Sequence, residues 1–163
     1  MKRFRARFSN YAIVAMVAVA ASACGDGTTT PITDPPEIEP FVGLWDAEEF
    51  RVTSDADSSI VADLIEIGGS FTLNIEASGT YTAQLSFTAT DSLGIQPFVE
   101  IGQMSVAGGF VTLRPTVPPG SPASSAYTFV REDFLRLVGP TEFDFNLDEV
   151  PDPAELFTEL QRR

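Results

Sequence analysis

The chain has 163 residues and is strongly acidic, with 23 Asp and Glu against 10 Lys and Arg and a formal net charge of −13. It contains no histidine and one cysteine, which excludes histidine-dependent catalytic triads, histidine-based zinc sites and any disulfide within the chain. An acidic surface repels phosphate backbones, so we expect no nucleic-acid partner. Only carboxylates remain for catalysis, and no two of them stand out by their spacing. We therefore expect a protein that is not an enzyme and carries no cofactor.

Residues 1–23 have the features of an export signal. A basic head is followed by residues 11–21, which carry no charge. This apolar run of 11 residues is too short for a transmembrane helix, which needs about 20, but it is typical of a signal peptide. The basic residues are Lys2, Arg3, Arg5 and Arg7. Removal of the signal would leave six arginines against 23 acidic residues, a net charge of about −17.

Cys24, the only cysteine, lies directly after this segment. The residues Ala21-Ser22-Ala23-Cys24 resemble the lipobox of bacterial lipoproteins, in which the cysteine is acylated and the chain is cut before it. The resemblance implies a protein held by Cys24 to a membrane of the cell envelope, and Gly25 after it favours the outer membrane over the inner one. The same small residues also satisfy the pattern for ordinary secretory cleavage, which would release a soluble protein.

Residues 24–40 are predicted to form a lipid-anchored, flexible linker. Gly, Thr, Pro and acidic residues dominate this segment, and no apolar period indicates a strand or helix. In an extended, polyproline-like form at ~3.1 Å per residue the linker would reach roughly 50 Å. The remaining residues, 41–163, have the length of one domain.

Alternation of apolar and polar residues runs through much of this domain and predicts half-buried antiparallel strands. Tight turns at residues 77–80, 107–109 and 132–133 predict hairpins between them. The predicted strands are 44–53, 71–76, 81–90, 98–106, 110–116, 126–131, 134–138, 143–148 and 154–162. Because no second layer of helices is predicted, we expect an all-β fold, an antiparallel up-and-down barrel of eight or nine strands.

One stretch departs from this alternation. Ile60, Val61, Leu64 and Ile65 recur at helical spacing, between a capping Asp-Ser pair at 57–58 and the glycine at 68. The pattern predicts one short helix between the first two strands. Such a helix would either cover the barrel mouth as a lid or close the barrel end as a plug.

Gly43 and Trp45 form a Gly-x-Trp motif at the start of the first predicted strand. With the connection and the strand meander that follow, this motif resembles the lipocalin-like domains of small bacterial lipoproteins. The resemblance spans residues 41–163 and implies that Trp45 closes one end of the barrel beneath an arginine from a late strand. Arg162 is the best candidate for that arginine and Arg131 the second. Without the resemblance, Trp45 is a core tryptophan beside a glycine that begins a strand.

The strand number bears on function, because an eight-stranded barrel is either filled by side chains or holds one small ligand. Inward positions predicted from the alternation include Tyr81 and Phe87 beside small residues such as Ala83. We expect a membrane-tethered cell-envelope lipoprotein whose barrel binds a small hydrophobic or amphipathic ligand, with Tyr81 and Phe87 in its site. The alternative is a filled barrel that serves as a non-catalytic interaction or envelope-assembly module.

The first strand adds two charged candidates for the ligand site. If its tryptophan points inward, strict alternation also turns Glu49 and Arg51 inward, where this pair could orient the polar head of a ligand. A bulge near Glu48 would instead send Phe50 and Val52 to the core and leave both charges in water. The cost of burying charge favours the bulge.

The acidic residues near the end of the chain allow two interpretations. Asp144, Asn146, Asp148, Asp152 and Glu155 have the spacing of ligands in a helix–loop–helix calcium site. A glutamate stands where such a loop needs glycine, however, and two prolines stiffen the segment. In the simpler interpretation the first three residues form the outward face of the predicted strand 143–148, and we expect no metal ion.

Overall fold

The structure of the protein is a computed structural model, which describes residues 37–88, 96–146, 148 and 150–163. The predicted signal peptide, Cys24 and most of the predicted linker lie outside the described residues. A 3-10 turn, η1 (Glu39–Phe41), precedes nine described strands. These are β1 (Gly43–Ser54), β2 (Val61–Asp63), β3 (Gly69–Ile75), β4 (Thr80–Phe87), β5 (Phe98–Ala107), β6 (Phe110–Val117), β7 (Ala123–Arg131), β8 (Phe134–Phe143) and β9 (Asp152–Arg162). Within the described part of the chain, no helix is long and apolar enough to cross a membrane.

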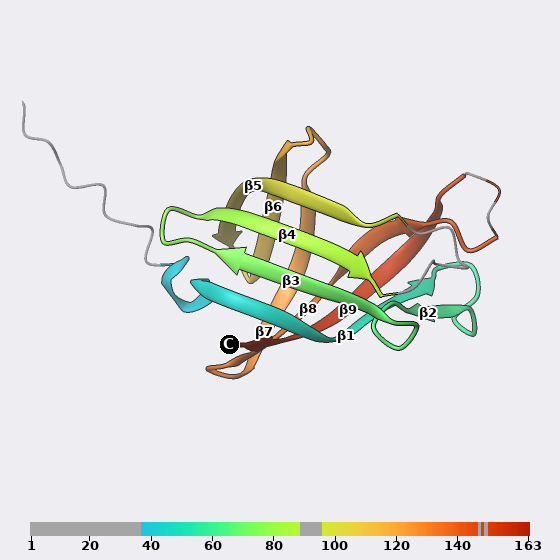
Figure 1. The fold of residues 1–163 in the computed structure, drawn as a ribbon, viewed down its shortest axis with the longest axis horizontal. Coiled ribbons are helices and arrows are strands. Elements are labelled where there is room, and N and C mark those ends of the chain that lie inside the picture. The colour runs from blue at the N-terminus through green and yellow to red at the C-terminus, as the bar shows by residue number, and fades with distance from the viewer. Residues whose placement is uncertain (1–36, 89–95, 147, 149) are drawn as a thin grey trace, which may run out of the picture. The chain divides into compact units, whose positions relative to one another are not determined.

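The strands form a closed antiparallel meander. Each strand from β3 to β8 pairs with the next one, and β9 returns to pair with β1 between Trp45 and Ser54. Figure 1 shows β1, β3 and β4 side by side in front of β7, β8 and β9. Because β2 pairs only with β1, the closed ring has eight strands and β2 is an additional ninth. The predicted all-β, up-and-down barrel of eight or nine strands is confirmed.

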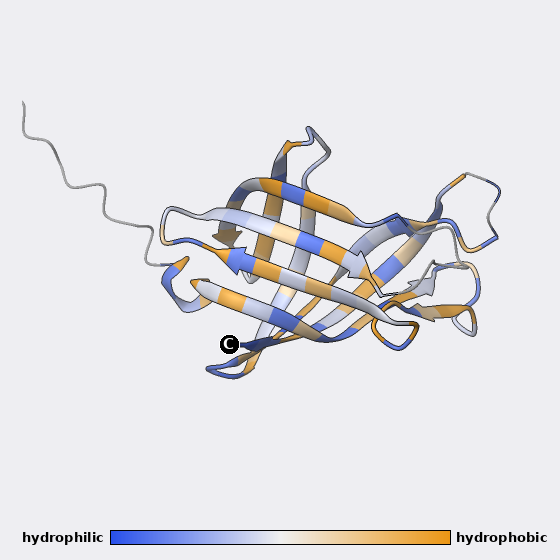
Figure 2. Ribbon diagram, in the orientation of Figure 1, coloured by the Kyte–Doolittle hydropathy of each residue, from blue (hydrophilic) through white to orange (hydrophobic). Residues whose placement is uncertain are grey.

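The alternation along the strands separates the barrel interior from its surface. In β4, Tyr81, Ala83 and Leu85 are buried, whereas the residues between them are half-buried or exposed. Figure 2 shows the corresponding change between hydrophobic and hydrophilic residues along individual strands. Burial of one face is what stabilises the sheet in this register, since a shift by one residue would expose the apolar side chains. The largest fully buried side chains include Trp45, Tyr81, Phe41, Leu73, Ile75, Leu135 and Leu160.

The helix predicted between the first two strands is not formed. Residues 61–63 form β2 instead, along the second half of β1, and turns precede and follow it. The turn after β2 is stabilised by Asp63, whose Oδ1 accepts hydrogen bonds from the backbone N–H groups of Ile65 (3.0 Å) and Glu66 (3.3 Å). Only Leu64 of this segment is fully buried in the core. The predicted lid or plug helix is therefore wrong, because a carboxylate satisfies the turn and β1 offers a partner strand.

The last part of the barrel also differs from the prediction. β8 runs through Gly139 and Pro140 to Phe143, so the predicted separate strand 143–148 is wrong. Gly139 allows this continuity, because a Cβ atom there would lie 2.6 Å from the carbonyl oxygen of Ser124 on the neighbouring strand. Beyond β8, Asp144 and Asn146 accept hydrogen bonds from the backbone N–H of Asp148 in a turn. The described residues contain no group of three or more His, Cys, Asp or Glu side chains placed to hold a metal ion.

The folded region begins before the predicted boundary at residue 41. Ile38 is buried in the core and packs against the turn between β3 and β4. At Gly79 in that turn, a Cβ atom would lie 2.9 Å from Cδ1 of Ile38. The predicted linker 24–40 is therefore too long at its C-terminal end, because the apolar Ile38 covers core residues that the strands alone leave open.

Candidate functional site: the barrel cavity

One end of the barrel is closed around Trp45, at the start of β1. Trp45 is fully buried, and its Nε1 donates a hydrogen bond to the carbonyl oxygen of Phe41 (2.7 Å). The guanidinium of Arg162 lies over the Trp45 ring, 4.4 Å from the ring centroid, and also donates to the carbonyl oxygen of Pro40. Gly43, at φ 134°, lies beside the stem of Arg162. Trp45, Arg162 and η1 thus form one closed end of the barrel.

Aromatic packing completes this closure. The Phe41 ring contacts Tyr127 edge-on, with centroids 4.9 Å apart, and lies 5.0 Å from the Phe129 ring. Arg131, the second candidate for the arginine over the tryptophan, lies elsewhere. It forms an ion pair with Asp133, and its guanidinium carbon lies 5.1 Å from the centroid of the Phe134 ring. A ligand that enters the barrel must therefore do so away from η1.

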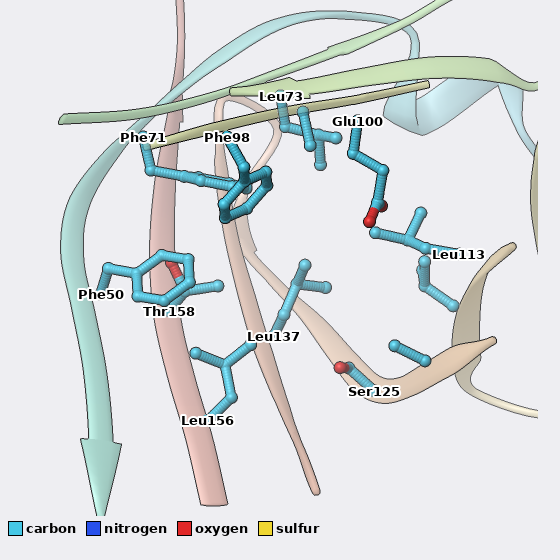
Figure 3. Close-up of a pocket in the computed structure, with 13 residues that line it drawn as sticks. Phe50, Phe71, Leu73, Phe98, Glu100, Leu113, Ser125, Leu137, Leu156 and Thr158 are labelled. Carbon is cyan, nitrogen blue, oxygen red and sulfur yellow. The ribbon is translucent and has the colours of Figure 1, made fainter. Parts of the chain in front are cut away.

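Beyond this closed end the barrel contains a cavity of about 140 Å³. A cavity of ~150 Å³ lined by apolar side chains is large enough to bind benzene, so this space accommodates one ring or a short alkyl chain. Ten of the thirteen lining residues are apolar, as Figure 3 illustrates. The lining residues are Phe50, Phe71, Leu73, Ala83, Phe98, Glu100, Val111, Leu113, Ala123, Ser125, Leu137, Leu156 and Thr158.

Three aromatic side chains form one wall of the cavity. Phe50 of β1 and Phe71 of β3 stack with their centroids 4.9 Å apart, and Phe98 at the start of β5 lies near them (Figure 3). Phe98 remains 41% exposed although it lines the cavity. This aromatic wall therefore extends from the apolar interior to the solvent.

The cavity contains one charged group, Glu100 of β5. Its carboxylate points into the ring of apolar side chains in Figure 3. Oε1 of Glu100 accepts a hydrogen bond of 2.5 Å from the hydroxyl of Tyr81 on the neighbouring strand β4. Burial raises the pKa of Tyr81 above its ordinary value of 10.0, and the hydrogen bond and negative charge of Glu100 raise it further. Tyr81 therefore stays a hydrogen-bond donor to Glu100 throughout the physiological pH range.

Gly102 makes this contact between neighbouring strands possible. It lies directly across from Tyr81 in the β4–β5 pair. A Cβ atom at Gly102 would lie 2.6 Å from Cε1 and 2.8 Å from Cζ of Tyr81. The ring can therefore lie flat across β5, with its hydroxyl at Glu100, only because this position has no side chain.

Two hydroxyl groups complete the polar part of the cavity. Thr158 of β9 donates its hydroxyl proton to the carbonyl oxygen of Glu49 (2.8 Å), so it offers a ligand only an acceptor. Ser125 of β7 also lines the cavity, with its oxygen at the inner surface in Figure 3. The cavity thus combines an apolar wall with a carboxylate and two hydroxyl groups.

The structure places the charged pair of the first strand outside the cavity. The pairing of β1 with β9 shifts register between Ala47 and Glu49, which is the bulge. Phe50 after it lines the cavity, so Glu49 and Arg51 face outward, where they form an ion pair of 2.7 Å. The guanidinium of Arg51 also lies 4.5 Å from the Phe157 ring centroid. The inward arrangement of Glu49 and Arg51 is therefore wrong: the bulge keeps both charges at the surface.

Tyr81 and Phe87 share the inner face of β4, but neither lines the cavity. Tyr81 contributes to the cavity only through the hydrogen bond that its hydroxyl donates to Glu100. Phe87 is half-buried against the glycine that begins β3, where a Cβ atom would lie 2.9 Å from its ring. Sequence reasoning missed Glu100. The signal that could have revealed it is the inward register of β5, which places an acidic residue and Gly102 between the apolar Phe98 and Met104.

Comparisons with known proteins find similarity to solved structures only. No protein-family model matches the chain, and no curated protein matches it. The chain is similar to a solved structure of a redesigned beta barrel, with 12% sequence identity and a TM-score of 0.45, over 78% of this chain and 95% of that chain. Interpretation of the site therefore depends on its geometry.

Proposed function

We propose that the protein is a membrane-tethered lipoprotein of the cell envelope whose barrel binds a small hydrophobic or amphipathic molecule. The observation that carries the ligand part is the cavity of about 140 Å³ inside the eight-stranded ring. An interaction or assembly module would need no such space, because a barrel filled by side chains would serve it equally well. The apolar wall favours a ligand with a hydrocarbon body, because burial of apolar surface is the main source of affinity in such sites.

The tether part of the proposal depends on the N-terminal sequence. The lipobox-like Ala21-Ser22-Ala23-Cys24 supports acylation of Cys24, and two or three acyl chains bind a membrane stably where one binds only marginally. The contact of Arg162 with the tryptophan of the Gly-x-Trp motif supports the lipocalin-like interpretation of the barrel. Since the folded region includes Ile38, residues 25–37 would separate the anchor from the barrel by roughly 40 Å if extended at ~3.1 Å per residue.

Native mass spectrometry of the purified full-length protein tests the ligand part of this proposal. The expected spectrum contains the protein with one bound small molecule, which collisional activation or denaturation releases. Because the cavity is small, the released mass should correspond to one ring or a short alkyl chain with a polar group. A spectrum that contains only free protein, before and after incubation with small hydrophobic compounds, would favour the filled-barrel alternative.

We predict that Cys24→Ser moves the protein from the membrane fraction to the soluble fraction of the envelope. The substitution removes the thiol that would carry the acyl group but leaves the charge and the folded domain unchanged. Membrane fractionation followed by detergent phase partitioning of both variants is the measurement. Ser22→Ala is the matched control, and it should stay with the membrane. Partitioning of the unsubstituted protein into the aqueous phase would contradict the anchor.

A further inference from the structure

We propose that the ligand of the barrel carries a protonated amine next to its apolar body, and that Glu100 is the residue that selects it. This inference rests on the proposed ligand-binding function and specifies the chemistry of that site. It starts from the position of a carboxylate in a cavity whose other lining groups are apolar side chains and two hydroxyls.

Among the residues that the structure describes, Glu100 forms no ion pair with a basic side chain. The residues that line the cavity include no arginine or lysine, and the basic residues of the predicted signal, Lys2, Arg3, Arg5 and Arg7, lie outside the described residues. Five of the described arginines have partners of their own: Arg51 pairs with Glu49, Arg131 with Asp133, Arg136 with Glu159 and Arg163 with Asp46, while Arg162 stacks on Trp45. The sixth, Arg114, is exposed on β6 and does not line the cavity. Glu100 is half-buried, and a carboxylate that is partly removed from water is stabilised by a nearby opposite charge. A cation that enters the cavity would therefore complete an ion pair with Glu100.

The hydrogen bonding of Glu100 points to the same ligand. An ionised carboxylate has about four acceptor sites, and in the described structure only Tyr81 donates to it. The hydrogen bond to Oε1 orients the carboxylate and leaves its remaining acceptor sites for a ligand. An ammonium group offers three donors and a full positive charge, whereas an alcohol offers one donor and a carboxylate offers none.

The volume of the cavity and the acidic character of the chain restrict the chemical class of the ligand further. A volume of about 140 Å³ holds one aromatic ring or a short alkyl chain, so the amine is attached to a small apolar group. The acidic chain, with 23 acidic against 10 basic residues, attracts cations to its surface and repels anions. A small anionic amphiphile such as a fatty acid is therefore a poor ligand for this barrel.

Three ring compounds of nearly equal size test the inference on the purified full-length protein. These probes are benzylamine, benzyl alcohol and benzoate, titrated by isothermal calorimetry at pH 7 and moderate salt. Benzylamine should bind at least about tenfold more tightly than benzyl alcohol, because hydrogen bonds to charged groups are stronger than those between neutral groups. Benzoate should bind most weakly of the three.

Glu100→Gln should remove this preference. The substitution keeps the shape of the side chain and removes its charge, so the affinity for benzylamine should fall about tenfold or more while that for benzyl alcohol changes less than about threefold. Glu49→Gln makes the same change of net charge on the outer face of β1 and should leave the ratio of the two affinities unchanged.

The outcomes separate this inference from the proposed function. If benzyl alcohol or benzoate binds as tightly as benzylamine, or if Glu100→Gln keeps the preference, the barrel binds small apolar molecules but the amine inference is wrong. If none of the three probes binds, both proposals fail together. The comparison among probes on the unsubstituted protein decides the question even if Glu100→Gln does not fold, which far-UV circular dichroism would reveal.

Discussion

Trp45→Ala should lower the free energy of unfolding by about 3–5 kcal/mol, the cost typical of truncating a large aromatic side chain in a packed core. Trp45 is fully buried and anchors both η1, through its hydrogen bond to Phe41, and the end of β9, through Arg162. Its removal leaves a cavity at the closed end of the barrel and an unpaired carbonyl oxygen. Urea unfolding followed by far-UV circular dichroism measures the effect, since this substitution removes the only tryptophan.

Two further variants show whether this loss of stability is specific to the closed end of the barrel around Trp45. Arg162→Met keeps an apolar stem over the ring but removes the cation, so it should cost less, about 0.5–2 kcal/mol. Phe110→Ala removes an aromatic ring that is 51% exposed at the start of β6, and it should cost under about 1 kcal/mol. A cost for Trp45→Ala no larger than that for Phe110→Ala would contradict the role of Trp45 as the closure of the barrel.

Several strands of the barrel could be predicted from the sequence because one side of each strand meets the core and the other meets water. This holds for the strands that contain Phe71 and Tyr81, where the apolar residues lie at every second position. The bulge in β1 could also be anticipated from the cost of burying charge, because it keeps Glu49 and Arg51 outside while Phe50 enters the core. These features depend on local patterns, which the sequence contains directly.

The segment that precedes β3 could not be predicted in this way, because its structure depends on a neighbour distant in sequence. A short apolar run is compatible with either a helix or a strand. Here residues 61–63 pair with β1, and Leu64 continues this contact by donating its backbone N–H to the carbonyl oxygen of Phe50. The continuation of β8 through Gly139 also depends on a part of the chain that is distant in sequence. Gly139 packs closely against the backbone of β7 and does not form a turn.

Glu100, the charged group of the cavity, could not be predicted from the sequence for a different reason. β5 carries apolar residues on both faces, with Val99 54% exposed and Ile101 40% exposed on the outside. The alternation therefore does not show which face of β5 is buried, and a single glutamate has no spacing that marks it. The role of Glu100 becomes evident only in the folded barrel, where the hydroxyl of Tyr81 on β4 donates a hydrogen bond to its carboxylate.

Gly102→Ala should both destabilise the barrel and disrupt the contact between Tyr81 and Glu100. A Cβ atom at Gly102 would lie 2.2 Å from the carbonyl oxygen of Arg114 and 2.6 Å from Cε1 of Tyr81. Overpacking of this kind costs about 1–3 kcal/mol, and a clash with the backbone of β6 favours the upper end of that range. The free energy of unfolding in urea is the measurement. Gly120→Ala is the control, because its new Cβ meets only the Pro115 ring, at 3.3 Å, and should change stability by less than about 0.5 kcal/mol.

An alkaline titration shows whether the lost stability comes from Tyr81. In the unsubstituted protein the raised pKa of Tyr81 keeps its proton bound at a pH where the unfolded chain has already lost it, so the free energy of unfolding falls as the pH rises above 10. In Gly102→Ala the displaced ring gains water and loses its bond to Glu100, so the pKa of Tyr81 should fall towards its ordinary value. Tyrosinate absorbance measures this change, with Tyr81→Phe identifying the contribution of that residue. A titration of Tyr81 that is the same with and without the alanine would show that Gly102 does not position its ring.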